Sequence, residues 1–268
     1  MIKLIALDLD GTLLGPDRQV GEADREAVAQ ARERGVHIVL NTARWYSLAQ
    51  RTAQRLELRA PLICHNGAHV KEPADGRELL HKQIPQEVAY EVAAFCDEGG
   101  FETYTTIDGV TYMRTPPKYQ IDPQRLPNDM RLADKHAAFV TGPATGILVF
   151  DDHAIEQVLD QFGERYQATL AFATAWSESL PSYVTITVAG TDKGAALQRV
   201  CEHLGVTPED AMAVGDTAQD VPMFEAAGIG VAMGNAPDDV KQKADAVAPS
   251  NSEGGVAWAI RRFVLDEG

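Results

Sequence analysis

The sequence predicts an α/β fold in which a doubly wound parallel-sheet (Rossmann-like) core is interrupted by an inserted α+β domain. Continuous apolar runs alternate with helix-like segments at both ends of the 268-residue chain. Such runs are expected of a parallel sheet whose strands are buried on both faces. The middle of the chain breaks that alternation and carries a hairpin signal, Asp108-Gly109, between two alternating runs.

Residues 1–83 are expected to supply the first part of the parallel sheet. The helix at 22–35 has acidic residues early, arginines late and Gly35 as its stop. The expected elements, in order, are strand 3–9 (KLIALDL), helix 22–35, strand 36–42 (VHIVLNT), helix 46–58 and strand 61–66 (PLICHN). This β-α-β-α-β order predicts parallel strands joined by helical crossovers.

Residues 84–188 are expected to form the inserted domain. A helix at 86–98 is closed by Gly99 and Gly100, and the stretch 116–135 is polar and bears several prolines. The other expected elements are strands at 101–107, 110–115, 146–152, 168–176 and 182–190 and a helix at 153–165. Short alternating runs predict antiparallel pairs, and therefore an α+β domain.

Residues 189–268 return to the first pattern. Helices are expected at 192–205, 221–228, 237–244 and 255–264, and strands at 211–216, 229–234 and 246–250. Segments 1–83 and 189–268 are therefore expected to form one doubly wound domain, with 84–188 inserted as a second.

Composition and charge restrict the partners. The chain has 24 basic and 39 acidic side chains, a formal net charge of −15, which disfavours nucleic acid and anionic membranes as partners. An anionic small molecule would need local positive charge from lysine, arginine, a helix N-terminus or a metal. Asp8 interrupts the apolar N-terminal run, and no apolar stretch is long enough to span a bilayer. These features predict a cytoplasmic protein, and no pattern sets its oligomeric state.

Four polar clusters fall where an expected strand ends or a helix begins. They are Asp8 with Asp10, NTAR at 41–44, Lys193, and GDTAQD at 215–220. Taken singly, each has an ordinary structural explanation, as turn residues, a helix N-cap or a surface lysine. Ligands of open parallel sheets bind beyond the carboxyl ends of the strands. The shared position of the four clusters therefore favours a functional site.

Carboxylates dominate this expected site. Asp8, Asp10, Asp216 and Asp220 would repel one another strongly if nothing compensated their charge. A hard divalent cation resolves that conflict, and an all-oxygen ligand set favours Mg²⁺, which commonly shares its site with phosphate. Hydroxyl, ammonium and backbone N–H groups nearby would then hold a phosphoryl group against the metal.

As a set, these motifs resemble the haloacid dehalogenase superfamily. DLDGTLL, a threonine closing the second strand, a lysine opening a helix after the insert, and GDTAQDVPMF followed by MGNAPDDVK occur in the family's order. Within it, the chain is similar to the Cof-type phosphatases, whose class IIB α/β cap lies between the second and third motifs. Residues 84–188 fall there, so the resemblance implies that they form a cap domain that sets substrate specificity.

The resemblance implies roles for the four aspartates. Asp8 corresponds to the nucleophile that forms an aspartyl-phosphate, and Asp10 to the general acid/base. The carboxylates of Asp8 and Asp216 would hold Mg²⁺ together with the backbone carbonyl of Asp10, and Asp220 would support the metal shell. Crowding by like charge is expected to keep a proton on Asp10 for the first step.

The phosphate- and substrate-binding positions of the family are matched in part. Thr42 and Lys193 match directly. The second motif usually reads Thr-Gly-Arg, whereas Ala43 precedes Arg44 here, and Arg44 either binds substrate or pairs with an acidic side chain. Gln219 stands where the family usually has asparagine, at a phosphate or substrate contact.

The sequence therefore predicts a phosphoric monoester hydrolase, a Mg²⁺-dependent phosphatase of small phosphomonoesters such as sugar phosphates. A phosphomutase is the close alternative, because it would use the same Asp8 chemistry and return the phosphoryl group to its substrate. A non-enzymatic receiver-like phospho-acceptor is a more distant one, because its phosphorylated aspartate ends a later strand. Tyr104, Tyr112 and Tyr119 of the insert either line a substrate pocket or pack within the sheet.

Overall fold

The computed structural model describes residues 1–116, 121–175 and 182–265. Contacts divide the chain into two compact units. The core unit comprises Met1–Leu80 and Asp192–Gly268, and the inserted unit comprises His81–Thr191. Each junction lies a few residues from the boundary expected from the sequence.

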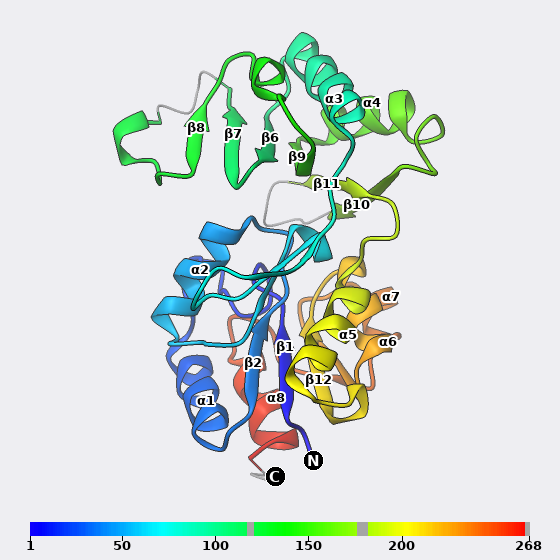
Figure 1. The fold of residues 1–268 in the computed structure, drawn as a ribbon. Helices are drawn as coiled ribbons and strands as arrows, with labels where there is room; N and C mark the ends of the chain where they lie inside the picture. Colours follow the sequence, from blue (N-terminus) through cyan, green and yellow to red (C-terminus); the bar gives the residue numbers. More distant parts are fainter. Residues whose placement is uncertain (117–120, 176–181, 266–268) are drawn as a thin grey trace. The chain divides into compact units, whose positions relative to one another are not determined.

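The core unit is built on a five-stranded sheet in the order β14-β13-β12-β1-β2 (Figure 1). All neighbouring strands are parallel, which confirms the doubly wound fold class. Leu7 of β1 lies opposite both Leu40 of β2 and Val214 of β12, so the central strands end close together. The strands are β1 (Leu4–Leu7), β2 (His37–Leu40), β12 (Ala211–Gly215), β13 (Ile229–Ala232) and β14 (Ala246–Val247).

Helices cover both faces of this sheet (Figure 1). Alternate residues of β1 point to opposite faces: Ile5 and Leu7 pack with α1, α2 and α8, whereas Leu4 and Ala6 pack with α5, α6 and α7. Burial of both faces explains why the strand sequences are apolar throughout. The helices are α1 (Glu22–Glu33), α2 (Tyr46–Arg55), α5 (Lys193–Leu204), α6 (Val221–Ala226), α7 (Asp238–Lys241) and α8 (Gly255–Phe263).

The strand expected at 61–66 departs from the parallel sheet. β3 (Leu62–Cys64) meets the end of β2 through a parallel bridge between Asn41 and Ile63. It otherwise pairs antiparallel with β4 (His69–Lys71), in a three-stranded sheet completed by β5 (Glu78–His81). The cause is a turn directly after β3, where three successive residues, 65–67, have φ values of 48°, 54° and 101°. This left-handed turn reverses the chain onto its own strand.

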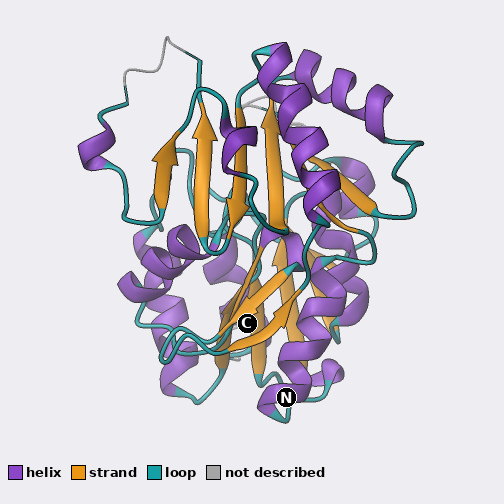
Figure 2. Cartoon of the chain, turned by 45° about the horizontal axis from the view of Figure 1, so that its top comes forward, coloured by secondary structure: helices purple, strands orange, loops and turns teal. Residues whose placement is uncertain are grey.

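The inserted unit contains a six-stranded sheet in the order β10-β11-β9-β6-β7-β8, labelled in Figure 1, and its strands are among those drawn orange in Figure 2. Helices α3 and α4 contribute to its apolar core, and all strand pairs except β7-β8 are antiparallel. Strand β8, inside the proline-bearing stretch, was not expected from the sequence. In the described part of the chain, no helix is long and apolar enough to cross a membrane. The elements are α3 (Gln86–Gly99), β6 (Thr103–Ile107), β7 (Val110–Arg114), β8 (Met130–Leu132), β9 (Ala144–Phe150), α4 (Asp152–Phe162), β10 (Leu170–Ala175) and β11 (Tyr183–Val188).

Two of the three tyrosines considered as pocket residues pack against aromatic rings of the inserted unit. The ring centroid of Tyr104 lies 4.8 Å from that of Phe150. Tyr112 stacks on Phe139 with centroids 4.7 Å apart. Tyr119 lies outside the described residues. Packing within the unit is therefore an observed role of Tyr104 and Tyr112.

A buried histidine links α3 to the segment before β9. His136 is fully buried, and its Nδ1 lies 2.6 Å from Oδ1 of Asp97. Its Nε2 has no hydrogen-bond partner among the described residues. Burial lowers the pKa of His136 from its ordinary value of 6.5, and nearby Arg114 acts in the same direction against the opposing effect of Asp97. The neutral imidazole is therefore the form that fits this site.

We expect acidification to destabilise the protein in part through His136. The unfolded chain takes up a proton near pH 6.5 whereas the folded chain resists it, so this contribution is complete above that pH and is lost as pH falls. Urea unfolding between pH 7.5 and 5 should show a smaller loss of unfolding free energy for His136→Gln than for the wild type. Parallel pH profiles for the two proteins would contradict this assignment.

Candidate active site

The carboxyl edge of the parallel sheet brings the sequence clusters together. Asp8 follows β1, Thr42 lies two residues beyond β2, and Asp216 follows β12. Lys193 is the first residue of α5, and its ammonium reaches Asp8. All of these residues belong to the core unit. The convergence expected from the strand ends is therefore present.

Lys193 is the central cation of the site. Only 2% of its surface is exposed, and its Nζ lies 2.6 Å from Oδ1 of Asp8 and 2.6 Å from Oδ1 of Asp220. Burial alone would lower the pKa of Lys193, but the two carboxylates outweigh it and the net pKa is raised. The side chain therefore remains charged, and the reading of Lys193 as a surface lysine is excluded.

Asp8 has two oxygens in different situations. Its Oδ1 accepts the hydrogen bond from Lys193, whereas no hydrogen bond to Oδ2 exists among the described residues. Burial raises the pKa of Asp8 to about 7, with contributions from Asp220 and Asp10 and against the effect of Lys193. One oxygen is thus anchored, and the other is available to an electrophile or a cation.

The segment after Asp8 packs closely against Asp216. The hydroxyl of Thr12 donates to Oδ1 of Asp216 at 2.8 Å. Gly11 has φ +83°, and a Cβ there would lie 2.1 Å from Oδ2 of Asp216, so this position requires glycine. Asn235 donates to the backbone carbonyl of Gly11 at 2.8 Å. Thr12 and Asn235 both lie within the sequence motifs, but local pattern alone indicates no role for either residue.

Asp220 uses both of its oxygens. Oδ1 accepts from Lys193, and Oδ2 accepts from the backbone N–H groups of Asp216 and Thr217 at 3.0 and 2.9 Å and from the Thr217 hydroxyl at 3.0 Å. Asp8, Asp216 and Asp220 each offer an oxygen within 4.8 Å of the others. Burial, followed by the charges of Asp8 and Asp220, raises the pKa of Asp216 well above its ordinary value. Asp220 therefore joins Lys193 to the loop that carries Asp216.

The guanidinium of Arg44 forms a bidentate ion pair with the carboxylate of Asp10. Nε lies 2.6 Å from Oδ2 and a terminal nitrogen 2.5 Å from Oδ1. Of the two roles considered for Arg44, the structure therefore displays pairing with an acidic side chain, and that acid belongs to the site. Like charge was expected to crowd Asp10, but the group in contact with its carboxyl is a guanidinium. The backbone N–H of Arg44 also donates to the Thr42 hydroxyl oxygen at 3.1 Å.

The two positions that depart from the family's motifs fit the local structure. Ala43 is buried and is not among the residues with positive φ, so alanine replaces glycine there without backbone strain. Gln219 is buried in a short 3₁₀ turn, Ala218–Asp220, directly before Asp220. The substrate contact expected of Gln219 stays a prediction.

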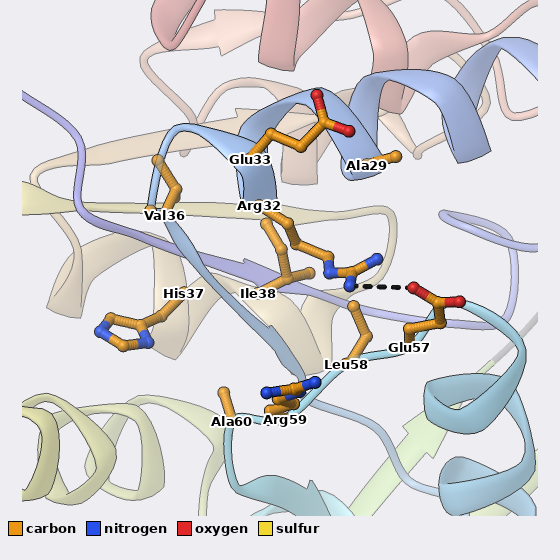
Figure 3. A pocket seen from close by; sticks show the side chains of 11 residues that line it. Ala29, Arg32, Glu33, Val36, His37, Ile38, Glu57, Leu58, Arg59 and Ala60 are labelled. Atoms are coloured by element: carbon orange, nitrogen blue, oxygen red, sulfur yellow. Dashed lines mark hydrogen bonds and ion pairs between the residues drawn. The ribbon is translucent and has the colours of Figure 1, made fainter.

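A cavity of about 530 Å³ in the core unit (Figure 3) has none of these carboxylates in its lining. Its lining includes His37, the first residue of β2, whereas Thr42 lies beyond the last. Arg32 on its wall donates to the carbonyl of Leu56 at 2.8 Å and pairs with Glu57 at 3.2 Å. The cavity therefore borders the amino end of β2, opposite the end that carries the site.

Fold and site together define an α/β enzyme whose carboxylates and lysine meet at the carboxyl edge of a parallel sheet. The chain belongs to the haloacid dehalogenase-like hydrolases, because the model of that family matches residues 5–260. A curated relative, the 5-amino-6-(5-phospho-D-ribitylamino)uracil phosphatase YcsE of Bacillus subtilis (strain 168), is 31% identical over an alignment of 267 residues that covers 98% of this chain and 96% of the relative.

Solved structures agree with this assignment. A haloacid dehalogenase-like hydrolase from B. subtilis superimposes with a TM-score of 0.83 at 26% identity, covering 98% of this chain and 100% of that one. A sugar phosphatase of subclass IIB has a TM-score of 0.79 at 23% identity, covering 97% of this chain and 98% of its own, and supports the fold. The resemblance to the Cof-type family with its class IIB cap is thereby confirmed.

We expect removal of the Asp220 carboxylate to destabilise the core unit. Asp220→Ala leaves the buried Lys193 with Asp8 as its one carboxylate partner. It also leaves three hydrogen-bond donors of the Asp216–Thr217 loop without their acceptor. The free energy of unfolding should therefore fall by about 3 kcal/mol or more. Urea unfolding measures this loss. Asp238→Ala is the matched control, because it removes the exposed pair with Lys241 at 3.8 Å, which contributes little. Equal effects of the two substitutions would contradict the central role of Asp220.

Proposed function

We propose that the chain is a Mg²⁺-dependent phosphatase that hydrolyses small phosphomonoesters through an aspartyl-phosphate on Asp8. Its enzyme class, phosphoric monoester hydrolase, is that of curated relatives across the full chain. The observation that carries the proposal is the state of Asp8. One of its oxygens is anchored by Lys193 at 2.6 Å, and the other makes no hydrogen bond with the described residues.

The residues present fit a hard divalent cation. Buried carboxylates outnumber the buried ammonium that they share, and the pKa values of Asp8 and Asp216 are both raised because burial and like charge disfavour ionisation. Carboxylate oxygens of Asp8 and Asp216 with the backbone carbonyl of Asp10 give an all-oxygen donor set, which suits Mg²⁺. A bound Mg²⁺ would neutralise these carboxylates and polarise the transferring phosphoryl group.

In the first step, Asp8 acts as nucleophile. Its Oδ2 attacks phosphorus, a new O–P bond forms, and the ester O–P bond breaks. Lys193 holds the carboxylate through Oδ1, and its charge together with the Thr42 hydroxyl stabilises the phosphoryl oxygens. The leaving oxygen takes a proton from the carboxyl of Asp10.

In the second step, Asp10 acts as base. It accepts a proton from water, whose oxygen attacks the phosphorus of the aspartyl-phosphate and releases phosphate and the Asp8 carboxylate. The guanidinium of Arg44 donates hydrogen bonds to both carboxylate oxygens of Asp10. One of these hydrogen bonds must break before the released oxygen of Asp10 can carry a proton to the leaving group. Arg44 thereby orients the acid/base group.

The substrate class follows from the small-molecule character of the relatives. One is named for a ribityl phosphate, and a fold relative is a sugar phosphatase. We infer that sugar and polyol phosphates belong to the substrate range of this chain. Specificity would come from the inserted unit, residues 84–188 in the sequence-based division, acting as a cap.

A screen of phosphate release from a panel of phosphomonoesters tests this proposal. Wild-type protein with Mg²⁺ should release phosphate from sugar phosphates, and EDTA should stop the reaction until Mg²⁺ is restored. Asp8→Asn should abolish turnover because an amide oxygen does not replace the nucleophile. Circular dichroism of this variant checks that the fold is intact.

The alternatives give different results in the same screen. Release from simple esters without a bisphosphate activator excludes a phosphomutase. Covalent phosphorylation of Asp8 without release of phosphate would indicate a phospho-acceptor. Near-normal activity of Asp8→Asn, or activity that persists in EDTA, would contradict the nucleophile or the metal assignment.

A further inference from the structure

Asn41 is a buried polar residue to which the proposed mechanism gives no task. It lies between the end of β2 and Thr42, and none of its surface is exposed. Its backbone N–H donates to the carbonyl of Leu7 at 2.8 Å, and it forms the bridge to Ile63 of β3. The backbone of Asn41 is therefore fixed to the two strands on either side of it.

The side chain of Asn41 reaches a third element. Its Nδ2 donates to the backbone carbonyl of Lys193 at 3.0 Å and lies 3.5 Å from Sδ of Met223. Its Oδ1 is buried without a hydrogen-bond partner in the described part of the chain. A buried carboxamide with an unsatisfied acceptor is unfavourable for stability, and such a group requires an explanation.

The hydrogen bond from Asn41 Nδ2 to the carbonyl of Lys193 supplies an explanation for this buried side chain. Lys193 and Thr42 are the two side chains proposed to bind the phosphoryl group, and they lie on separate elements, α5 and the end of β2. Asn41 is adjacent to Thr42 in sequence and bonded to the main chain of Lys193. Its amide therefore links the chain beside Thr42 to the main chain of Lys193.

A second contact holds the same two elements together. The backbone N–H of Asn66 donates to the carbonyl of Thr42 at 3.0 Å. At Gly67, the next residue, a Cβ would lie 2.2 Å from the carbonyl oxygen of Asp192, which precedes Lys193. The left-handed turn thus packs against the start of α5, and the Asn41 hydrogen bond adds a side-chain contact to the same segment.

We propose that Asn41 is a positioning residue that fixes Lys193 relative to Thr42 and Asp8 for phosphoryl binding. This inference rests on the proposed function. The bond acts on the Lys193 main chain, and its consequence is the placement of an ammonium that must contact both Asp8 and the substrate. A displacement of that ammonium by a fraction of an ångström weakens each interaction in the transition state.

The substitution Asn41→Leu separates positioning from structural support. Leucine is close to asparagine in size and removes both the hydrogen bond and the unsatisfied acceptor, so the urea midpoint should stay the same or rise. Meanwhile kcat/KM should fall about tenfold to a hundredfold, with a matching loss of affinity for inorganic phosphate measured by calorimetry. Asn41→Ala should weaken phosphate binding to a similar degree, at lower stability.

Thr52→Val is the matched control. Thr52 is a buried polar residue of α2 in the core unit, and valine has its shape. We expect this control to keep the wild-type kcat/KM and phosphate affinity. It shows what an isosteric polar-to-apolar change does away from the site.

The outcomes are distinct. Lower phosphate affinity of Asn41→Leu at an unchanged or higher urea midpoint supports positioning. Wild-type kcat/KM and phosphate affinity in Asn41→Leu would overturn it, and so would a loss of activity that follows a fall in the urea midpoint. If the wild type releases no phosphate from any ester, the proposed function fails, and phosphate binding by wild type and Asn41→Leu still tests the positioning role.

Discussion

The ion pairs of one buried lysine are the constraint on which the site depends. Lys193 lies between Asp8 and Asp220, 2.6 Å from an oxygen of each, in a region where an unpaired charge is costly. Asp220 in turn accepts from the loop that carries Asp216. Removal of the ammonium would leave a cluster of buried carboxylates that repel one another. That charge balance therefore stabilises the arrangement of the loops at this edge of the sheet.

Two aspartates one residue apart, Asp8 and Asp10, have different cationic partners, which suits the different tasks proposed for them. β1 ends at Leu7, so Asp8 and Asp10 lie beyond the strand and are free of its alternation. Asp8 is anchored through one oxygen by Lys193, and Asp10 is held through both oxygens by Arg44. In the proposed mechanism, Lys193 leaves one oxygen of Asp8 available for attack, and Arg44 orients the carboxyl of Asp10 that moves protons. Different cationic partners therefore distinguish two identical side chains.

Much of this was predictable from the sequence because it depends on local patterns. Continuous apolar runs predict the parallel sheet, and polar residues at strand ends predict that Asp8, Thr42 and Asp216 lie at one edge of it, where the structure places them. The pairing of Arg44 with Asp10 was not predictable, since local pattern leaves open which acid a guanidinium reaches. The bond from Asn41 to Lys193 joins residues distant in sequence and depends on how α5 docks, which local pattern does not encode. The separation of β3 from the parallel sheet was not predictable from the sequence, because the left-handed turn at 65–67 that follows it begins with two residues other than glycine.

The proposed mechanism depends on Asp8 carrying the phosphoryl group during turnover. Brief reaction with a substrate, acid quenching and borohydride reduction would convert an aspartyl-phosphate to homoserine, and mass spectrometry of the N-terminal peptide would locate the change. We expect conversion at position 8, with Asp10 unmodified and no conversion in Asp8→Asn. Conversion at Asp10 or elsewhere, or none at all in an enzyme that is turning over, would contradict it.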